Sequence, residues 1–438
     1  MSDKLDQILI LYKQPNFSEK LIELRNKLSE AAIFNLGNKK EIRKLEKIIV
    51  EIQDEGDKAV AKYTEEFDDV ELAPEQFRVN KQDLERSHHE TNKNLLRSIR
   101  QAIENVRKYQ EKIFIASKKA NQHPGIKYTP IKRVGICVPG ASAPLPSTVV
   151  MCAVPAQVAG VKEIVVVSPP RYKGSIHPVT LAVCFELGID EVYRIGGVQA
   201  VAALAFGTQI ITSVDKIVGP GNQWVQTAKQ LMFGTVGIDS IAGPSEVLII
   251  ANDKANPAWV AADMLSQVEH APGSAVVFTD SQHLAEKVLV ELKKQVNQIS
   301  RAKETTECLR NLSGIFVFKN MLDIIASAND FASEHLEIQC GDESREIAQK
   351  IENAGAIFIG DCSPVAVGDY WAGPSHTLPT ARTAMFSSAL TSNDFIKSIS
   401  IIEYDRKKLA ESAEDIIRLA EAEGLDAHAR SVKIRQED

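Results

Sequence analysis

The sequence has 438 residues, of which 44% are hydrophobic and 25% are charged, which is the composition of a globular protein long enough for two or three domains. Its formal net charge of −7 comes without the clustered Lys and Arg that phosphate binding requires, so we expect no nucleic-acid partner and no membrane partner. The longest apolar stretch, which begins at Ser147, is interrupted by Pro155 and by polar side chains, so no run reaches the roughly 18 residues of a membrane span.

The N-terminus has an acidic start and no small-residue cleavage site, so we expect no signal peptide and a cytoplasmic protein. The cysteines are scattered and form no CxxC pair, which argues against a disulfide framework and against a Cys-based zinc site. We expect them to be small, mostly buried side chains. They are Cys137, Cys152, Cys184, Cys308, Cys340 and Cys362.

Between about residues 38 and 113, charged and apolar residues alternate at helical spacing, as in "KKEIRKLEKIIVEIQDEGDKAVAKYTEEF". This pattern predicts amphipathic helices whose charges form solvated faces. We assign "SHHE" to such a face rather than to a metal site, because the adjacent His88 and His89 point in different directions from a helix.

From Arg133 the pattern changes to short β-branched runs that end in Gly, Pro or Ser and lead into helices: "RVGICVPG", "EIVVVSPP", "EVYRIGG" and "DKIVGPGN". A second series contains "EVLIIAN", "SAVVFTD", "GIFVF", "LEIQ" and "GAIFIGD". Such alternation predicts two α/β domains with parallel sheets. Ligands of open sheets lie outside the carboxyl ends of the strands, where we place "GGVQ", "GPGN" and "GDCSPVAVGDY".

The residues after about 391 contain no strand series and read as helices. A helical tail that follows a finished sheet must pack somewhere, either on its own chain or on a partner subunit. The tail and the N-terminal helices are therefore candidates for dimer contacts.

Several polar groups are candidates for chemistry. Gln267 and His270 lie three residues apart before an Ala-Pro-Gly stop, so they share one face at a helix end. Glu334 beside His335 brings together the two residue types that most often serve acid–base catalysis.

The glycine turns lack both the G-x-G-x-x-G fingerprint and a P-loop, so they are either a nucleotide site or only tight turns. Four histidines lie in polar stretches that suit zinc, although each one singly also fits a surface position: His270, His335, His376 and His428.

Six segments, in this order, closely resemble histidinol dehydrogenases over nearly the whole chain: "GPGN", "IDSIAGPSEVLIIAN", "DMLSQVEHAPGS", "FASEHLEIQ", "GDYWAGPSHTLPT" and "EGLDAHARSV". The resemblance implies oxidation of L-histidinol through bound L-histidinaldehyde to L-histidine with two NAD⁺, one Zn²⁺ per site, and a homodimer with a shared site. Two Rossmann-like domains with parallel-rich sheets and helical extensions at both ends are the fold we expect.

The resemblance also implies roles for individual residues. The zinc ligands are Gln267, His270 and Asp369 of one subunit and His428 of the partner subunit. His335 is the general base for the alcohol, and Glu334 activates water for the second step. The substrate positions are Ser245, Gln267, His270, His335, Asp369, His376, Glu423 and His428, and the NAD positions are Cys137, Gln199 and Asn222.

We expect residues 1–30 to form an N-terminal helical extension, and residues 31–136 with 246–390 to form a discontinuous α/β domain with the zinc and catalytic residues. Residues 137–245 would form a Rossmann-like domain that contributes the NAD site. Residues 391–438 would form the tail that completes the site of the partner.

One position departs from the family, since Cys137 stands where an NAD-contacting Tyr is usual and Ala141 follows where Gly is common. Two alternatives remain: a related zinc- and NAD-dependent dehydrogenase of another primary alcohol, such as a sulfonated diol, and a zinc-stabilised dimer without activity. His376 and Glu423 argue against the first, and the Glu334–His335 pair argues against the second.

Overall fold

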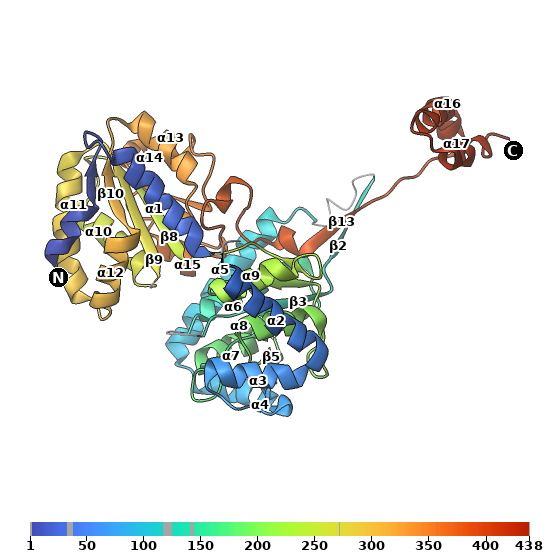
Figure 1. Cartoon of the computed structure of the whole chain (residues 1–438), viewed down its shortest axis with the longest axis horizontal. Helices are drawn as coiled ribbons and strands as arrows, with labels where there is room; N and C mark the ends of the chain where they lie inside the picture. Colours follow the sequence, from blue (N-terminus) through green and yellow to red (C-terminus); the bar gives the residue numbers. More distant parts are fainter. Residues whose placement is uncertain (1, 33–37, 117–124, 141–143, 271, 438) are drawn as a thin grey trace. The chain divides into compact units, whose positions relative to one another are not determined.

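The computed structural model describes residues 2–32, 38–116, 125–140, 144–270 and 272–437. The chain divides into two units, each of which is described by itself. The core unit contains Met1–Phe114 and Pro130–Phe395, and the tail unit contains Ile115–Thr129 and Ile396–Asp438 (Figure 1). The core unit contains two parallel sheets, which confirms the predicted α/β fold class. None of the described helices is long and apolar enough to cross a membrane.

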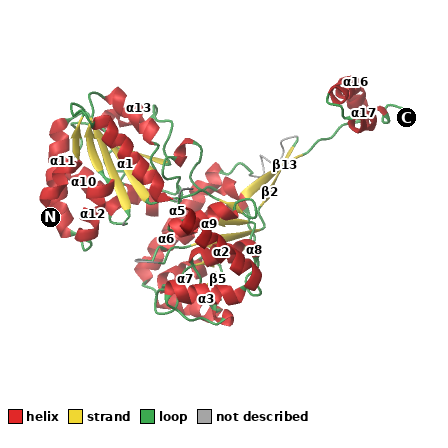
Figure 2. Cartoon of the chain, viewed as in Figure 1, coloured by secondary structure: helices red, strands yellow, loops and turns green. Residues whose placement is uncertain are grey.

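One sheet of the core unit has six strands, all paired in parallel, in the order β1-β10-β9-β8-β11-β12. Its strands are β1 (Leu9–Leu11), β8 (Ser245–Ala251), β9 (Gly273–Thr279), β10 (Gly314–Val317), β11 (His335–Gln339) and β12 (Ala356–Ile359). Helices cover both of its faces (Figure 2). They are α1 (Phe17–Ala32), α10 (Pro257–Val268), α11 (Gln282–Gln295), α12 (Ala302–Leu312), α13 (Met321–Phe331), α14 (Ser344–Ala348) and α15 (Val365–Tyr370).

The apolar side chains of these strands pack into two separate cores, because successive side chains alternate between the faces of a sheet. Val247 and Ile249 of β8 are buried together with side chains of α10, α11 and α12. The intervening Leu248 and Ile250 are buried on the other face with side chains of α1 and α13. Nearly continuous hydrophobic strands are therefore what this doubly covered sheet requires.

The other sheet has five parallel strands in the order β5-β4-β3-β6-β7. They are β3 (Arg133–Cys137), β4 (Glu163–Val167), β5 (Glu191–Tyr193), β6 (Lys216–Val218) and β7 (Gly237–Ile238). This is the doubly wound order, and its switch point lies between β3 and β6. The helices are α2 (Lys39–Glu55), α3 (Asp57–Asp68), α4 (Lys81–Glu90), α5 (Lys93–Ile113), α6 (Pro146–Ala159), α7 (Pro178–Glu186), α8 (Gly197–Phe206) and α9 (Gln223–Met232).

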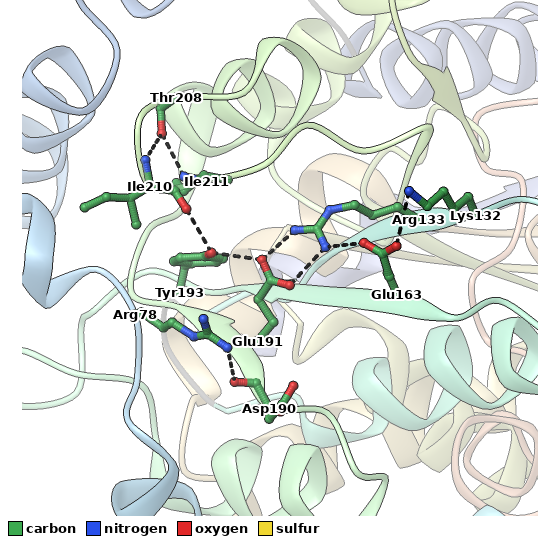
Figure 3. A network of polar contacts seen from close by, with 10 residues as sticks. All are labelled: Arg78, Lys132, Arg133, Glu163, Asp190, Glu191, Tyr193, Thr208, Ile210 and Ile211. Carbon is green, nitrogen blue, oxygen red and sulfur yellow. Dashed lines mark hydrogen bonds and ion pairs between the residues drawn. The ribbon is translucent and has the colours of Figure 1, made fainter.

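Charged side chains close the amino ends of three adjacent strands of this sheet (Figure 3). The Arg133 guanidinium donates to Glu163 Oε2 and to Glu191 Oε2, both at 3.0 Å. Tyr193 OH donates to Glu191 Oε1 at 2.9 Å. Because the Arg133 side chain is only 8% exposed, these bonds offset the cost of burying a cation and hold β3, β4 and β5 together, while Arg133 Nε has no hydrogen-bond partner among the described residues.

Two observations differ from the expected domain organisation. The helices of residues 39–113 pack mainly on the five-stranded sheet, where the apolar stripe of α2 is buried against α8. Helix α5 also contacts residues 246–390, since Asn105 Nδ2 donates to Trp371 O at 3.0 Å. Residues 9–11 are not helical but form β1, which pairs with β10 at the edge of the six-stranded sheet. The chain therefore starts in the six-stranded sheet, builds the five-stranded part and returns at β8.

The "SHHE" segment also differs from the solvated face that we expected. The His88 side chain is only 14% exposed, and its Nε2 lies 2.7 Å from Glu186 Oε2. Its ring packs against Phe185. His88 thus joins α4 to α7, while the His89 side chain remains 72% exposed.

The tail unit contains a two-stranded sheet of β2 (Ile126–Pro130) and β13 (Ile396–Ser400), followed by α16 (Arg406–Ala422) and α17 (Asp426–Lys433). The expectation of a tail without strands was therefore wrong for "IKSIS", where apolar and polar residues alternate and β2 supplies a partner. The helices α16 and α17 contact each other and leave Leu419 and Ile434 exposed.

Candidate active site

A cavity of about 570 Å³ in the core unit gathers most of the predicted site residues. It is lined by side chains from both sheets and from their connecting segments. The predicted residues that line it are Asn222, Ser245, Gln267, His270, Glu334, His335, Asp369 and His376. Glu423 and His428 belong to the tail unit, where both are exposed.

The residues from the six-stranded sheet lie at the amino ends of its strands. Ser245 is the first residue of β8, and His335 is the first residue of β11. Gln267 lies in the last turn of α10, which ends just before β9 begins at Gly273. The expected position at the carboxyl ends is therefore wrong for this sheet. Helices that run back along a parallel sheet end at its amino edge, and α10 brings Gln267 there.

Gly273 allows this close approach of helix and strand. A Cβ atom at this position would lie 2.3 Å from the carbonyl oxygen of Gln267, which no side chain tolerates without a backbone shift. The glycine of the "APGS" stop thus does more than end a helix, since it lets β9 start directly beside the Gln267 backbone.

The imidazole of His335 has one fixed and one free nitrogen. Its Nδ1 lies 3.1 Å from the carbonyl oxygen of Glu246, which can only accept, so Nδ1 carries a hydrogen. Its Nε2 is buried without a hydrogen-bond partner and lies 3.7 Å from Asp369 Oδ1. The residue is 3% exposed. Buried polar atoms are rarely left unpaired, so this nitrogen marks a position where a ligand would complete the site.

The charges around His335 are strongly coupled. Burial opposes the charged ring, but the carboxylates of Glu334 and Asp369 outweigh it and raise the pKa of His335 to about 10. Burial also works against the charge of Asp369, yet the neighbouring His335 lowers the pKa of that carboxyl. The ring is therefore held as a cation by two carboxylates in this structure.

Glu246, which sequence reasoning did not single out, holds Glu334 by reciprocal hydrogen bonds. The backbone N–H of Glu246 donates to Glu334 Oε2 at 2.9 Å, and the backbone N–H of Glu334 donates to Glu246 Oε1 at 3.3 Å. Burial and the charge of Glu334 raise the pKa of Glu246 to about 8. The available signal was an acidic residue at the start of the otherwise apolar strand "EVLIIA".

His376 occupies the wall of the cavity formed by α6. Its Nε2 lies 3.2 Å from the hydroxyl of Ser147, near the N-terminus of that helix. Burial lowers the pKa of His376, so its ring favours the neutral form. A neutral imidazole and a hydroxyl can bind a polar substrate group without adding charge.

No group of three or more His, Cys, Asp and Glu side chains is arranged to hold a metal ion within the described ranges. The core unit nevertheless brings an amide, an imidazole and a carboxylate to one cavity, from Gln267, His270 and Asp369. This donor set suits a borderline divalent ion such as zinc.

A second cavity of about 590 Å³ lies at the carboxyl ends of β3, β4, β5 and β6, where the sequence places NAD contacts. Cys137, Gln199 and Asn222 all line it, and Asn222 lines the first cavity as well. Both polar atoms of the Gln199 side chain are buried without a partner. Burial raises the pKa of Cys137 to about 12, so its thiol stays neutral and packs as we expected.

The "GPGN" turn between the cavities requires a glycine at its start. Gly219 has φ of +107°, and a Cβ there would lie 2.3 Å from the carbonyl oxygen of Cys137. The fully buried Lys229 bonds to Asp239 and donates to Gly219 O at 3.0 Å, while Asp239 Oδ2 accepts from Gly219 N at 2.7 Å. A buried ion pair thus fixes the turn that carries Asn222.

The fold and the two cavities describe a class of α/β enzyme with a catalytic site beside a nucleotide-type cavity. The histidinol dehydrogenase family model matches residues 35–436. Curated histidinol dehydrogenases include one from Rhodopirellula baltica, 44% identical over 90% of this chain and 87% of that protein, and one from Halalkalibacterium halodurans, 41% identical over 96% and 99%. The crystal structure of histidinol dehydrogenase from Elizabethkingia anophelis is 34% identical, with a TM-score of 0.86 over 98% of both chains.

The chain therefore belongs to the histidinol dehydrogenase family, whose members carry out the NAD-dependent oxidation of histidinol to histidine in histidine biosynthesis.

Proposed function

We propose that this chain oxidises L-histidinol to L-histidine in the cytoplasm at the cavity around His335, in two steps through bound L-histidinaldehyde, with one NAD⁺ for each step. The observation that carries the proposal is the buried, unpartnered Nε2 of His335 in a cavity that also holds Glu334, Gln267 and His270. Asn222 lines both this cavity and the one at the carboxyl ends of β3 to β6, so substrate and nicotinamide would meet beside it.

Zinc is the metal that the donor set fits best. Gln267, His270 and Asp369 would hold it together with His428 of the partner subunit, and the tail unit would thereby supply the remaining imidazole. When bound, it would orient the amino and imidazole nitrogens of the substrate. The exposed Leu419 and Ile434 of the tail unit are consistent with packing on a second subunit.

His335 would act as the general base of the first oxidation. Its Nδ1–H is committed to the carbonyl oxygen of Glu246, so Nε2 is the nitrogen that accepts the hydroxyl proton. Asp369 contributes to the raised pKa of the ring in this structure. Use of Asp369 as a metal ligand would weaken that contribution and favour the neutral ring that a base requires.

Glu334 would serve the second oxidation. The aldehyde must gain water before it can lose a second hydride, and Glu334 would take a proton from that water. The N–H of Glu246 donates to Glu334 Oε2 and keeps the carboxylate at the amino end of β11, beside His335. Retention of the aldehyde in the cavity would prevent escape of a reactive carbonyl.

The direct test is the amount of NADH formed per L-histidinol by the purified protein, with L-histidine quantified in parallel. We expect two NADH per histidine, activity lost after chelation, and activity restored by zinc. A folded, zinc-loaded dimer that forms no histidine would overturn the proposal.

The shared site is tested by mixing subunits. His428→Ala and His270→Ala homodimers should both be inactive, because each lacks one ligand in every site. Heterodimers of the two should regain activity, since one of their two sites contains all four ligands. No recovery after subunit exchange has been verified would exclude a site completed by the partner subunit.

A further inference from the structure

A buried polar cluster lies beneath the cavity, between α10 and the six-stranded sheet, and has no part in the chemistry described above. It consists of Asp263 on α10 and of Glu337 and Gln339 on β11. The Nε2 of Gln339 donates to Asp263 Oδ2 at 2.7 Å and to Glu337 Oε2 at 3.1 Å. The carboxyl groups of Asp263 and Glu337 thus share one donor, the Gln339 amide, and burial raises the pKa of both groups. Glu337 and Gln339 are only 1% and 2% exposed.

Each contact of this cluster reaches an element that carries a predicted metal or catalytic group. Asp263 precedes Gln267 by four residues on α10, so it lies one turn away on the same side of the helix. Glu337 follows His335 by two residues on β11, so both side chains point to the same face of the sheet.

The third element is α15, which carries Asp369. Glu337 Oε1 accepts a hydrogen bond from the backbone N–H of Val365, the first residue of α15, at 2.9 Å. Asp369 lies four residues further on that helix. The cluster therefore joins α10, β11 and α15 by hydrogen bonds. On these elements its contacts lie two to four residues from Gln267, His335 and Asp369.

The apolar surroundings of the cluster indicate that its polar groups do not serve stability alone. On the same face of the sheet, the neighbouring strands contribute apolar side chains such as Val247, Ile249 and Val277 to the core with α10. Buried carboxyl groups need partners and a shared hydrogen, whereas apolar residues of the same size often serve stability as well or better. What polar groups add is direction, because each hydrogen bond fixes the spacing and orientation of the two elements that it joins.

We propose that Asp263, Glu337 and Gln339 form a positioning cluster that fixes the spacing of Gln267, His335 and Asp369 for metal binding. None of the three contacts substrate, and the inference rests on the zinc site of the proposed function. Groups just outside a metal's ligands commonly change metal affinity by about 10- to 100-fold when they are replaced.

The test compares two substitutions at one position in the full-length zinc enzyme. Glu337→Leu removes the bonds to Val365 and Gln339, and it should weaken zinc binding by about 10- to 100-fold in a chelator competition. It should also lower kcat, while KM for NAD⁺ stays unchanged because the second cavity is remote from the cluster.

Glu337→Gln should keep zinc affinity within about threefold of the unmodified enzyme, because the new amide preserves the main bonds. Its carbonyl oxygen can accept from Val365 N–H, and its NH₂ group can donate to Asp263. The Gln339 amide can rotate so that its Oε1, which is buried without a partner, accepts a hydrogen bond from the new NH₂ group. Recovery by this variant separates positioning by hydrogen bonds from a need for charge.

Ser344→Ala is the matched control, since the Ser344 hydroxyl is a buried partner of Cys340 N–H at 2.9 Å beyond the other end of β11. It should lower stability without changing zinc affinity. If Glu337→Leu does not fold, Gln339→Leu replaces it, with an expected loss of about tenfold in zinc affinity. A folded Glu337→Leu or Gln339→Leu variant that binds zinc like the unmodified enzyme would overturn the inference, whereas absent zinc binding by the unmodified dimer would overturn the proposed zinc site itself.

Discussion

The two parallel sheets of the core unit present opposite ends to their cavities. The five-stranded sheet offers the carboxyl ends of its strands to the second cavity, while Arg133, Glu163 and Glu191 close its amino ends. The six-stranded sheet offers its amino ends, where Ser245 and His335 begin β8 and β11. The two parallel sheets thus present opposite edges to their cavities.

The electrostatics of the covering helices explains why each edge suits its ligand. Helices of a parallel sheet begin near the carboxyl edge, where their N-termini carry partial positive charge and attract anions such as a pyrophosphate. They end near the amino edge, where partial negative charge favours a cation. Gln267 and Asp369 both lie in the last turns of their helices. The rule that ligands lie at carboxyl ends therefore predicts the nucleotide position in the five-stranded sheet, whereas a metal ion is better held at the amino edge.

The largest effects should come from the amino edge of the six-stranded sheet. His335→Ala should lower kcat for histidinol by about 10²- to 10⁴-fold, because the proposed general base of the first oxidation is lost. Glu334→Gln should impair aldehyde oxidation much more than alcohol oxidation, since only the second step needs activated water. Rates with each substrate measure this, and equal losses in the Glu334 variant would remove the assigned role.

A substitution of Gln199 at the carboxyl edge of the five-stranded sheet should change cofactor binding but not metal binding. Gln199→Leu should raise KM for NAD⁺ about tenfold, which corresponds to one lost hydrogen bond, and should leave zinc affinity unchanged. It should also raise the melting temperature of the free protein, because the unpartnered buried amide is removed. A lower melting temperature together with an unchanged KM would show that the amide has a structural partner instead.

A smaller effect is expected where the chain departs from its family. Cys137→Tyr restores the usual ring in a cavity of about 590 Å³ and should lower KM for NAD⁺ by about threefold, the scale of one weak aromatic contact. Cys137→Ser is the control, since it changes the polar atom without adding a ring. If KM rises in the tyrosine variant, the cavity is already fitted to the cysteine.

The closed amino edge of the five-stranded sheet should matter for stability and not for activity. Burial opposes the charge of Glu191, but bonds from Arg133 and Tyr193 outweigh it and lower its pKa. A lowered folded pKa gives stability that is present above the unfolded pKa of about 4.3 and is lost as the pH falls through the folded pKa.

Glu191→Gln should therefore lower the free energy of unfolding at pH 7 by about 1–3 kcal/mol and flatten its dependence on pH below about 4.5. Urea unfolding at several pH values measures both effects. Unchanged stability at pH 7 would show that the Arg133 bond to Glu163 suffices.

The strands and most helices could be predicted because their patterns are local. "EVLIIAN" and "SAVVFTD" are continuous apolar runs between turn residues, and they form β8 and β9. The short β1 and β13 were missed, since three or five residues give little periodicity and their pairing partners lie far away in the chain.

The site was predictable only in part. The resemblance named Gln267, His270 and Asp369, and the structure brings them to one cavity, but no local pattern shows that Glu246 would bond to Glu334 or Gln339 to Asp263. Those contacts depend on the register of β8 and β11 and on the packing of α10. Tertiary packing, which no local pattern shows, also determines that α2 lies on α8 and not on the six-stranded sheet.

The pairing of β1 with β10 has a consequence for synthesis of the chain. Leu9 pairs with Ile315, so an edge strand made at the very start has to wait for about 300 further residues. At 5–20 residues per second this delay is about 15–60 s. The five-stranded part, whose strands all lie between these two, can fold on the ribosome in that interval. Residues 9–11 are thus the segment of the sheet that waits longest for its partner strand during translation.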